Sequence, residues 1–114
     1  MPNVYTNYKA VLTTSELTTL YTVGSETTAI IKSLRATNID EENDCKIKAF
    51  IVDTDSVSYT LETNRNIQKG TSEELFNSYS FSTSPVVLKE SEALKVQAEN
   101  GGDLHMILSV LEIT

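Results

Sequence analysis

Several residue types that build cross-links, flexible segments or catalytic sites are scarce in this sequence. It has one cysteine, which excludes a disulfide bond within the chain, and one histidine, which limits imidazole chemistry to a single group. Four glycines and two prolines exclude a collagen-like repeat or a long linker. No Gly-x-Ser-x-Gly turn, phosphate-binding loop or zinc-ligand spacing is present, so no motif favours an enzyme class.

Long apolar runs are missing as well. The longest, Ala49–Val52, has four residues, whereas a membrane-spanning helix needs about 18. The first twenty residues contain one basic residue and no apolar block, so we expect no signal peptide, and no Asn-x-Ser/Thr acceptor occurs. We therefore expect a protein that is made and used inside a cell, or released without the secretory route, and that has no membrane partner.

Positive charge is in short supply. Nine lysines and arginines stand against sixteen aspartates and glutamates, which gives a formal net charge of −7. A field of that sign repels phosphate backbones, and the five tyrosines and three phenylalanines are scattered without interleaved basic residues. We therefore expect no nucleic-acid partner, and we interpret the aromatic residues as core or interface residues.

Threonine is abundant, with fifteen copies, many of them beside Ile, Val, Leu or Tyr. Branching at Cβ restricts the side chain and favours strands over helices. With 114 residues, 39% of them hydrophobic and 22% charged, the chain has the size and composition of one globular domain. We predict a single domain over residues 1–114, in which residues 1–7 form a short mobile arm.

Alternation of apolar and polar residues predicts about eight short strands, separated by turn-forming residues. This all-β pattern is typical of an antiparallel β-sandwich, of which the jelly roll is one form. Asn64–Gln68 is predicted as a separate short strand, Thr71–Tyr79 fits either a helical turn or an edge strand, and Asn100–Asp103 is predicted to close a hairpin. The other predicted strands are Tyr8–Thr13, Leu17–Val23, Thr27–Asn38, Cys45–Val52, Val57–Glu62, Val86–Leu88, Leu94–Glu99 and Leu104–Thr114.

Three of these strands carry apolar residues on both faces. In Cys45–Val52, Phe50 and Val52 continue the face that begins with Lys46 and Lys48, so we expect the far end of that face to be covered as well. In Thr27–Asn38, the alternation places Ile30 with Leu34 on one face and Ile31 on the other. In Leu104–Thr114 both faces are apolar along most of the strand, so we expect it to be covered on both sides. A single sandwich exposes one face of each sheet, and its edge strands invite pairing with other chains. We therefore expect a homo-oligomer or a docked subunit.

Two side chains that could carry chemistry are interpreted as structural. His105 lies in a predicted strand among apolar neighbours, with no nucleophile motif to serve, so we interpret it as a packing or interface residue. Cys45 begins a strand on the same face as Ile47 and has no basic cluster nearby, which indicates a core residue rather than a reactive thiol. We assign no catalytic, cofactor-binding or metal-binding residue, and we expect no cofactor.

The acidic segment Asp40–Asp44 raises the question of a calcium site. Its acidic residues occupy the first three ligand positions of an EF-hand loop, but Cys45 stands where that loop needs glycine, so the EF-hand hypothesis fails. A looser cation site that this segment shares with Asp53 and Asp55 stays open as a hypothesis. The simpler interpretation is a solvated acidic loop.

Several stretches of the sequence resemble a family of viral proteins. These stretches are Leu20–Val23, Glu26–Leu34, Val86–Ala98 and Leu104–Ile113. They are similar to small β-sandwich virion structural proteins of tailed bacteriophages, of the marine and cyanobacterial type. The resemblance spans Leu17–Thr114, with Gly24 where that family often has proline and with Thr71–Ser84 matching least.

The resemblance implies a non-enzymatic virion protein that is assembled in the host cytoplasm and present in many copies. Its partners would be further copies of itself and other virion proteins, either the major capsid protein or neck and tail proteins. Our first hypothesis is a capsid decoration or cement subunit on the head exterior, since many weak contacts on a symmetric lattice act together. A neck, tail or fibre-attachment component is the alternative, and a carbohydrate- or calcium-binding recognition module is a further one.

Overall fold

The computed structural model describes residues 3–75 and 86–114, and all regular elements in these two ranges are strands. The predicted all-β fold is confirmed. Within the same ranges no helix is long and apolar enough to cross a membrane. The strands are β1 (Asn3–Leu12), β2 (Thr18–Thr22), β3 (Thr28–Asn38), β4 (Cys45–Val52), β5 (Ser58–Ile67), β6 (Ser72–Glu74), β7 (Val86–Leu88), β8 (Ala93–Ala98) and β9 (Leu104–Ile113).

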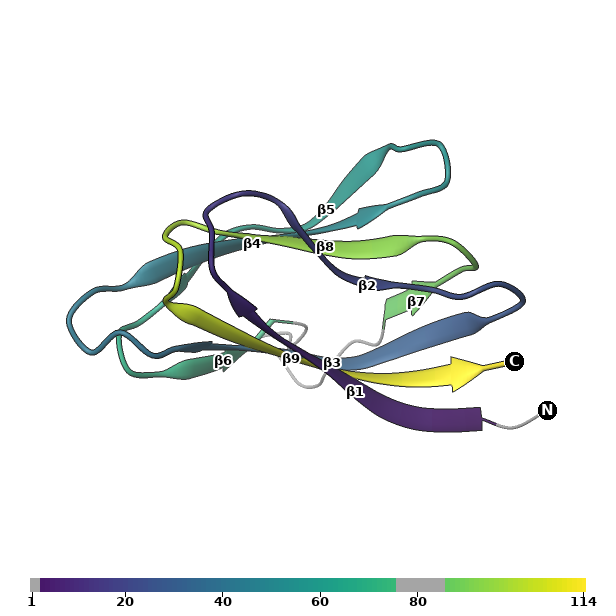
Figure 1. Ribbon diagram of the computed structural model, residues 1–114, viewed down its shortest axis with the longest axis horizontal. Helices are drawn as coiled ribbons and strands as arrows, with labels where there is room; N and C mark the ends of the chain where they lie inside the picture. The colour runs from purple at the N-terminus through teal and green to yellow at the C-terminus, as the bar shows by residue number, and fades with distance from the viewer. Residues whose placement is uncertain (1–2, 76–85) are drawn as a thin grey trace, which may run out of the picture.

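The strands form two antiparallel sheets that pack on each other as a β-sandwich (Figure 1). The five-stranded sheet has the order β1-β9-β3-β6, with β7 also paired to β3, and the four-stranded sheet has the order β2-β8-β4-β5. The first strand therefore lies beside the last, the second beside the last but one, and so on inward to β4 and β5. This nesting is the topology of a jelly roll in which β6 and β7 share the place of one strand.

The core lies between the sheets as one continuous cluster of apolar side chains. Burial follows the two-residue period of a strand, so alternate residues of β9 and of its counterparts in the other sheet point inward. Burying each large aliphatic side chain contributes about 1.5–3 kcal/mol. Fully buried members include Leu104, Met106, Leu108 and Val110 from the five-stranded sheet, and Ile47, Ala49, Leu94 and Val96 from the four-stranded sheet.

Strand β3 differs from the prediction in the face that its isoleucines occupy. Ile31 is buried together with Leu34, whereas Ile30 is half-buried on the outer face. The register with β9 shifts between Ile31 and Ser33, so Lys32 is an extra residue that makes a β-bulge. Because one extra residue inverts the alternation, the two halves of β3 present opposite parities to the core.

A carboxylate from β6 lies beside the bulge in β3. The Glu74 side chain accepts a hydrogen bond from the Ser33 hydroxyl and a second one, of 2.8 Å, from the backbone N–H of Leu34. The Leu34 carbonyl accepts a hydrogen bond of 2.8 Å from Leu75 N, so the backbone groups of Leu34 face β6 and not β9. The carboxylate therefore satisfies a backbone N–H next to the bulge, at the point where β6 ends.

Some strand boundaries also differ from the prediction. Strand β1 begins at Asn3 rather than Tyr8, so residues 3–7 of the predicted arm are paired with β9, where Asn3 lies opposite Ile113. The predicted strands 57–62 and 64–68 form the single strand β5, because register shifts against β4 accommodate the residues between them. Within the predicted segment 71–79, residues 72–74 form an edge strand, and residues 76–79 lie outside the described residues.

The predicted hairpin around Asn100–Asp103 is wrong, because β8 and β9 belong to different sheets and the loop between them crosses the sandwich. A side chain at Gly101 would place its Cβ only 2.5 Å from the carbonyl oxygen of Thr13. Gly102 has a φ of 87° and donates its N–H to Leu12 O at 2.7 Å. These glycines permit a close approach of two loops rather than a tight hairpin turn.

Candidate functional site

The outer face of the five-stranded sheet carries a line of apolar side chains that crosses four strands. Tyr5 of β1 lies opposite Leu111 of β9, Leu111 opposite Ile30 of β3, and Ile30 opposite Val87 of β7. We call these four residues the apolar row. Tyr5 is 70% exposed and Val87 56%, and the two central residues are half-buried. Of the described residues, none forms a further layer over this face.

Further along the same outer face, β9 presents His105 and Ile107. His105 is exposed between Val11 and the threonine of β3 opposite it, and Ile107, 42% exposed, lies opposite Lys9 and Arg35. Together with neighbouring residues, Lys9, Val11, His105 and Ile107 line a shallow depression of about 250 Å³. Within residues 3–75 and 86–114, the last strand is therefore covered on its inner side, and its outer side is partly exposed.

The outer face of the four-stranded sheet has a different character. Lys46 and Lys48 of β4 and Lys95 of β8 lie on it, and we call it the lysine face. A depression of about 400 Å³ is lined there by Lys46, Lys48 and Gln97, among others. The Gln97 amide donates a hydrogen bond of 3.1 Å to Ser15 O. Phe50 lies opposite Lys95 and both are half-buried, so the polar, exposed part of this face is the end that carries Lys46 and Lys48.

At one flank, two tyrosines and a glutamate join the sheets. Tyr21 of β2 donates a hydrogen bond of 2.6 Å to a carboxylate oxygen of Glu112 in β9, and Tyr8 of β1 donates one of 3.1 Å to the same oxygen. The two tyrosine rings lie 4.8 Å apart between centroids. Burial, followed by the hydrogen bond to Glu112, raises the pKa of both phenols, and most strongly that of Tyr21. We call these three residues the tyrosine latch.

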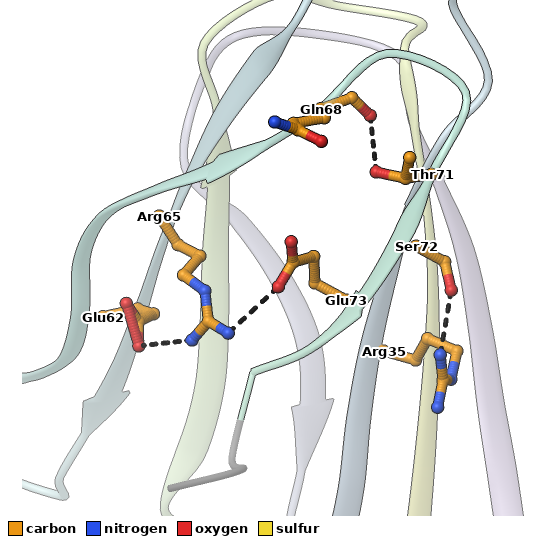
Figure 2. A network of polar contacts seen from close by, with 7 residues as sticks. All are labelled: Arg35, Glu62, Arg65, Gln68, Thr71, Ser72 and Glu73. Atoms are coloured by element: carbon orange, nitrogen blue, oxygen red, sulfur yellow. Dashed lines mark hydrogen bonds and ion pairs between the residues drawn. The ribbon is translucent and has the colours of Figure 1, made fainter. Parts of the chain in front are cut away.

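At the opposite flank, an arginine joins β5 to β6 (Figure 2). The Arg65 guanidinium contacts Glu73 of the five-stranded sheet at 3.1 Å and Glu62 of its own strand at 3.6 Å. Nearby, Arg35 donates a hydrogen bond of 2.8 Å to the Ser72 hydroxyl, which ties β6 to β3. We call Arg65, Glu62 and Glu73 the arginine latch. Both flanks of the sandwich are therefore closed by charge-assisted contacts.

Neither latch was predicted from the sequence. Tyr21 and Glu112 are separated by 91 positions and Arg65 and Glu73 by eight, and each pair meets only because the jelly roll brings two sheets together. The sequence contains one local signal, Glu112. It is a polar residue at the last inward-facing position of β9, where the other inward-facing residues are apolar. It indicates that the Glu112 carboxylate needs a hydrogen-bond partner between the sheets, but it does not say which residue that partner is.

Cys45 and His105 occupy the kinds of place that the sequence indicates. Cys45 is fully buried in the core, and burial raises the pKa of its thiol, which disfavours the reactive thiolate. His105 is exposed on the outer face of β9, far from Cys45 in the other sheet. The structure does not bring these two chemistry-bearing side chains together.

The acidic loop between β3 and β4 is held by its own backbone. Asp40 accepts hydrogen bonds from the N–H groups of Glu42 and Asn43, and Asp44 accepts one from Lys69 N; these bonds lower the pKa of both carboxyls. Asp53 lies at the other end of β4, about 25 Å away for a strand of this length. Across residues 3–75 and 86–114, no three acidic, histidine or cysteine side chains gather as metal ligands, which contradicts the shared cation site.

No protein family and no curated protein matches the sequence. Among solved structures, a chain of infectious bursal disease virus, Gx strain, matches with a TM-score of 0.50 and 13% identity, over 96% of this chain and 32% of the viral chain. A mutant VP2 protein of the same virus, in T=1 particles, matches with a TM-score of 0.47 and 12% identity, over 96% and 31%. The present chain thus spans about a third of the length of these viral chains. At 13% identity, the likeness to the chain of the Gx strain shows a shared fold alone.

Proposed function

We propose that this chain acts, as one domain over residues 1–114, as a non-enzymatic structural subunit of a virion. The observation that supports this most is the apolar row, which crosses β1, β9, β3 and β7 on an outer face. Exposed apolar surface of this kind is stabilised when a neighbouring subunit covers it. The fold adds support, because jelly rolls are common in viral capsids and a chain of infectious bursal disease virus shares the sandwich.

Within that role, we infer a decoration or cement subunit on the head of a tailed bacteriophage, assembled in the host cytoplasm. The resemblance of residues 17–114 to small phage virion proteins supports the phage assignment. The opposite characters of the two outer faces support decoration, because the apolar row can dock on a shell while the lysine face stays in water. Its partners would be the major capsid protein and further copies of this chain.

A neck, tail or fibre-attachment role is the second candidate. It is favoured by one specific observation, the long and regular edge strand β1, which spans ten residues. Edge-to-edge contacts between identical subunits can close into rings of the kind that connect head and tail.

The number of copies per particle separates the two roles. Quantitative mass spectrometry of purified particles should give hundreds of copies in a fixed ratio to the major capsid protein, with a cryo-EM map showing this density on the head exterior. About six or twelve copies, the stoichiometry of a ring, would overturn decoration in favour of the neck or tail. Absence of the chain from washed particles would overturn the virion role itself.

The third hypothesis, a recognition module, is tested by titration calorimetry of the purified chain. We expect no heat of binding with calcium chloride, because Asp40 and Asp44 already accept backbone hydrogen bonds. We also expect none with a panel of soluble glycans. A saturable heat with either would contradict a purely structural role.

A further inference from the structure

The edges of the two sheets are not alike. The strands β6 and β7 have three residues each, β2 has five and contains a register shift, and β5 is shifted twice against β4. Short strands and bulges are devices that keep an edge from pairing with another chain. Strand β1 has none of them: its ten residues pair with β9 in unbroken register, and they include no proline and one charge, Lys9.

The free side of β1 offers backbone groups at every second residue. Two hydrogen bonds at the strand ends show which way the backbone groups point. Just before β9, Asp103 O accepts a hydrogen bond of 2.8 Å from Ile39 N, so the odd-numbered residues of β9 face β3. At the end of β1, Leu12 O accepts one of 2.7 Å from Gly102 N, so Leu12 faces the β9 side. Antiparallel ladders alternate, so the even-numbered residues of β1 bond to β9, and the odd-numbered ones, such as Asn7, turn N–H and C=O to the free side. In the part of the chain that the structure describes, no strand pairs with that side.

Charge favours a second copy of this chain as the partner at this edge. The chain has sixteen acidic residues, yet none of them lies among the first fifteen positions. Two copies that each carry −7 are therefore repelled least when they approach through β1. Lys9 meets its own counterpart only if the pairing is centred on that residue, so every other register avoids a like-charge pair.

We propose that β1 pairs antiparallel with β1 of a second copy, about a two-fold axis at Tyr8, so that one sheet continues through the dimer. Antiparallel pairing of identical strands is self-complementary, as a two-fold interface requires. In this register Tyr5 lies opposite Val11 of the second copy, and Lys9 lies opposite Asn7. Tyr5 and Val11 are 70% and 53% exposed, and an aromatic side chain beside a β-branched one is a favourable cross-strand pair.

The molecular mass in solution tests the pairing. Sedimentation or light scattering between about 1 and 100 µM should give a dimer, twice the 12.6 kDa of one chain. Asn7→Pro removes a free-side N–H without touching the ladder to β9 and should give a folded monomer. Asn7→Ala, which keeps the N–H, should stay dimeric. A monomeric parent chain, or a dimeric Asn7→Pro variant, would overturn the proposal.

Cysteine cross-linking tests the register even if the proline variant does not fold. With residue 5 opposite residue 11 of the second copy, the Tyr5→Cys, Val11→Cys double variant brings two Cα atoms to about 5.5 Å, within disulfide range. It should give a covalent dimer on oxidation, and the single Tyr5→Cys variant should not. Cys45 is buried and does not compete. A cross-link in the single variant, or none in the double variant, would overturn this register.

The pairing does not depend on the virion role. A monomeric chain found on particles would refute the dimer and leave the proposed function standing. A dimer found on no particle would do the reverse.

Discussion

The two outer faces of this sandwich present different side chains. On the five-stranded sheet, Tyr5, Leu111, Ile30 and Val87 line up across four strands. On the four-stranded sheet, Lys46 and Lys48 are exposed on the outer face, and Phe50 lies there opposite Lys95. A jelly roll leaves one face of each sheet toward solvent, so the fold alone does not explain why the two faces carry different side chains. The side chains divide the molecule into a face suited to a neighbour and a face suited to water.

The largest expected effect comes from breaking the layer that keeps the two faces apart. Leu108→Asp, or equally Val110→Asp, places a carboxylate among fully buried core residues of β9, which costs about 4 kcal/mol or more and should abolish folding or assembly. Ile107→Asp, one position away on the outer face, should fold within about 0.5 kcal/mol of the parent. Circular dichroism and urea unfolding measure both. A soluble Leu108→Asp variant that still assembles fully would contradict the placement of Leu108 on the buried face of β9.

The next effect concerns the faces themselves. Replacing Tyr5 and Val87 by lysine should weaken binding to virus particles from which this chain has been removed by at least about tenfold. The reason is that the variant adds charge to the apolar row, which the particle would cover. The matched double variant, Lys46→Glu with Lys48→Glu, changes charge on the lysine face and should bind within about twofold. Cosedimentation of purified chain with particles measures this. Equal losses in both variants would show that the two faces do not differ in role.

The flanks that join the two faces should also be unequal. Tyr21→Phe removes the 2.6 Å hydrogen bond to Glu112 from a part-buried site and should lower the free energy of unfolding by about 1–2 kcal/mol. Arg65→Met leaves the aliphatic stem and removes a more exposed ion pair, for about 0–1 kcal/mol. Urea midpoints of the two variants give the order. A larger loss in Arg65→Met would reverse the comparison.

The smallest effect is a pH dependence of the tyrosine latch. The folded-state pKa of Tyr21 lies above its ordinary value of 10, so the unfolded chain releases this proton first. The latch therefore stabilises fully below pH 10, and its contribution is lost as the pH rises through 10 toward the folded-state pKa. Between pH 8 and pH 11 the parent chain should lose about 1 kcal/mol more than Tyr21→Phe. Parallel slopes of stability against pH for the two proteins would contradict this.

Alternation along single strands was enough to predict most of the fold. In β4, Cys45, Ile47 and Ala49 are buried and the lysines between them are exposed, as the two-residue period requires. The prediction failed where pairing with another strand decides the structure. The bulge at Lys32 depends on the register against β9. Strand β8 pairs with β2 and β4 and not with β9, which follows it in the sequence. Neither feature can be predicted from the alternation within a single strand.

The candidate surfaces were predictable only in part. Apolar residues on both faces of the last strand indicated an exposed apolar surface, and Ile107 and Leu111 belong to it. The apolar row as a line was not predictable, since it requires the lateral order of β1, β9, β3 and β7. The pairing of Tyr21 with Glu112, 91 positions apart, was not predictable either, because no local pattern identifies the partner of Glu112.

The extra residue at Lys32 has a consequence for how the chain tolerates changes in its length. Removing Lys32 would leave Ile31 inward, Ser33 outward and Leu34 inward, which is the regular alternation. A deletion of one residue near either end of β3 would instead shift the residues between it and the bulge by one position, which turns buried side chains among them toward solvent. We therefore expect this strand to tolerate the loss of one residue at the bulge better than a loss near either of its ends.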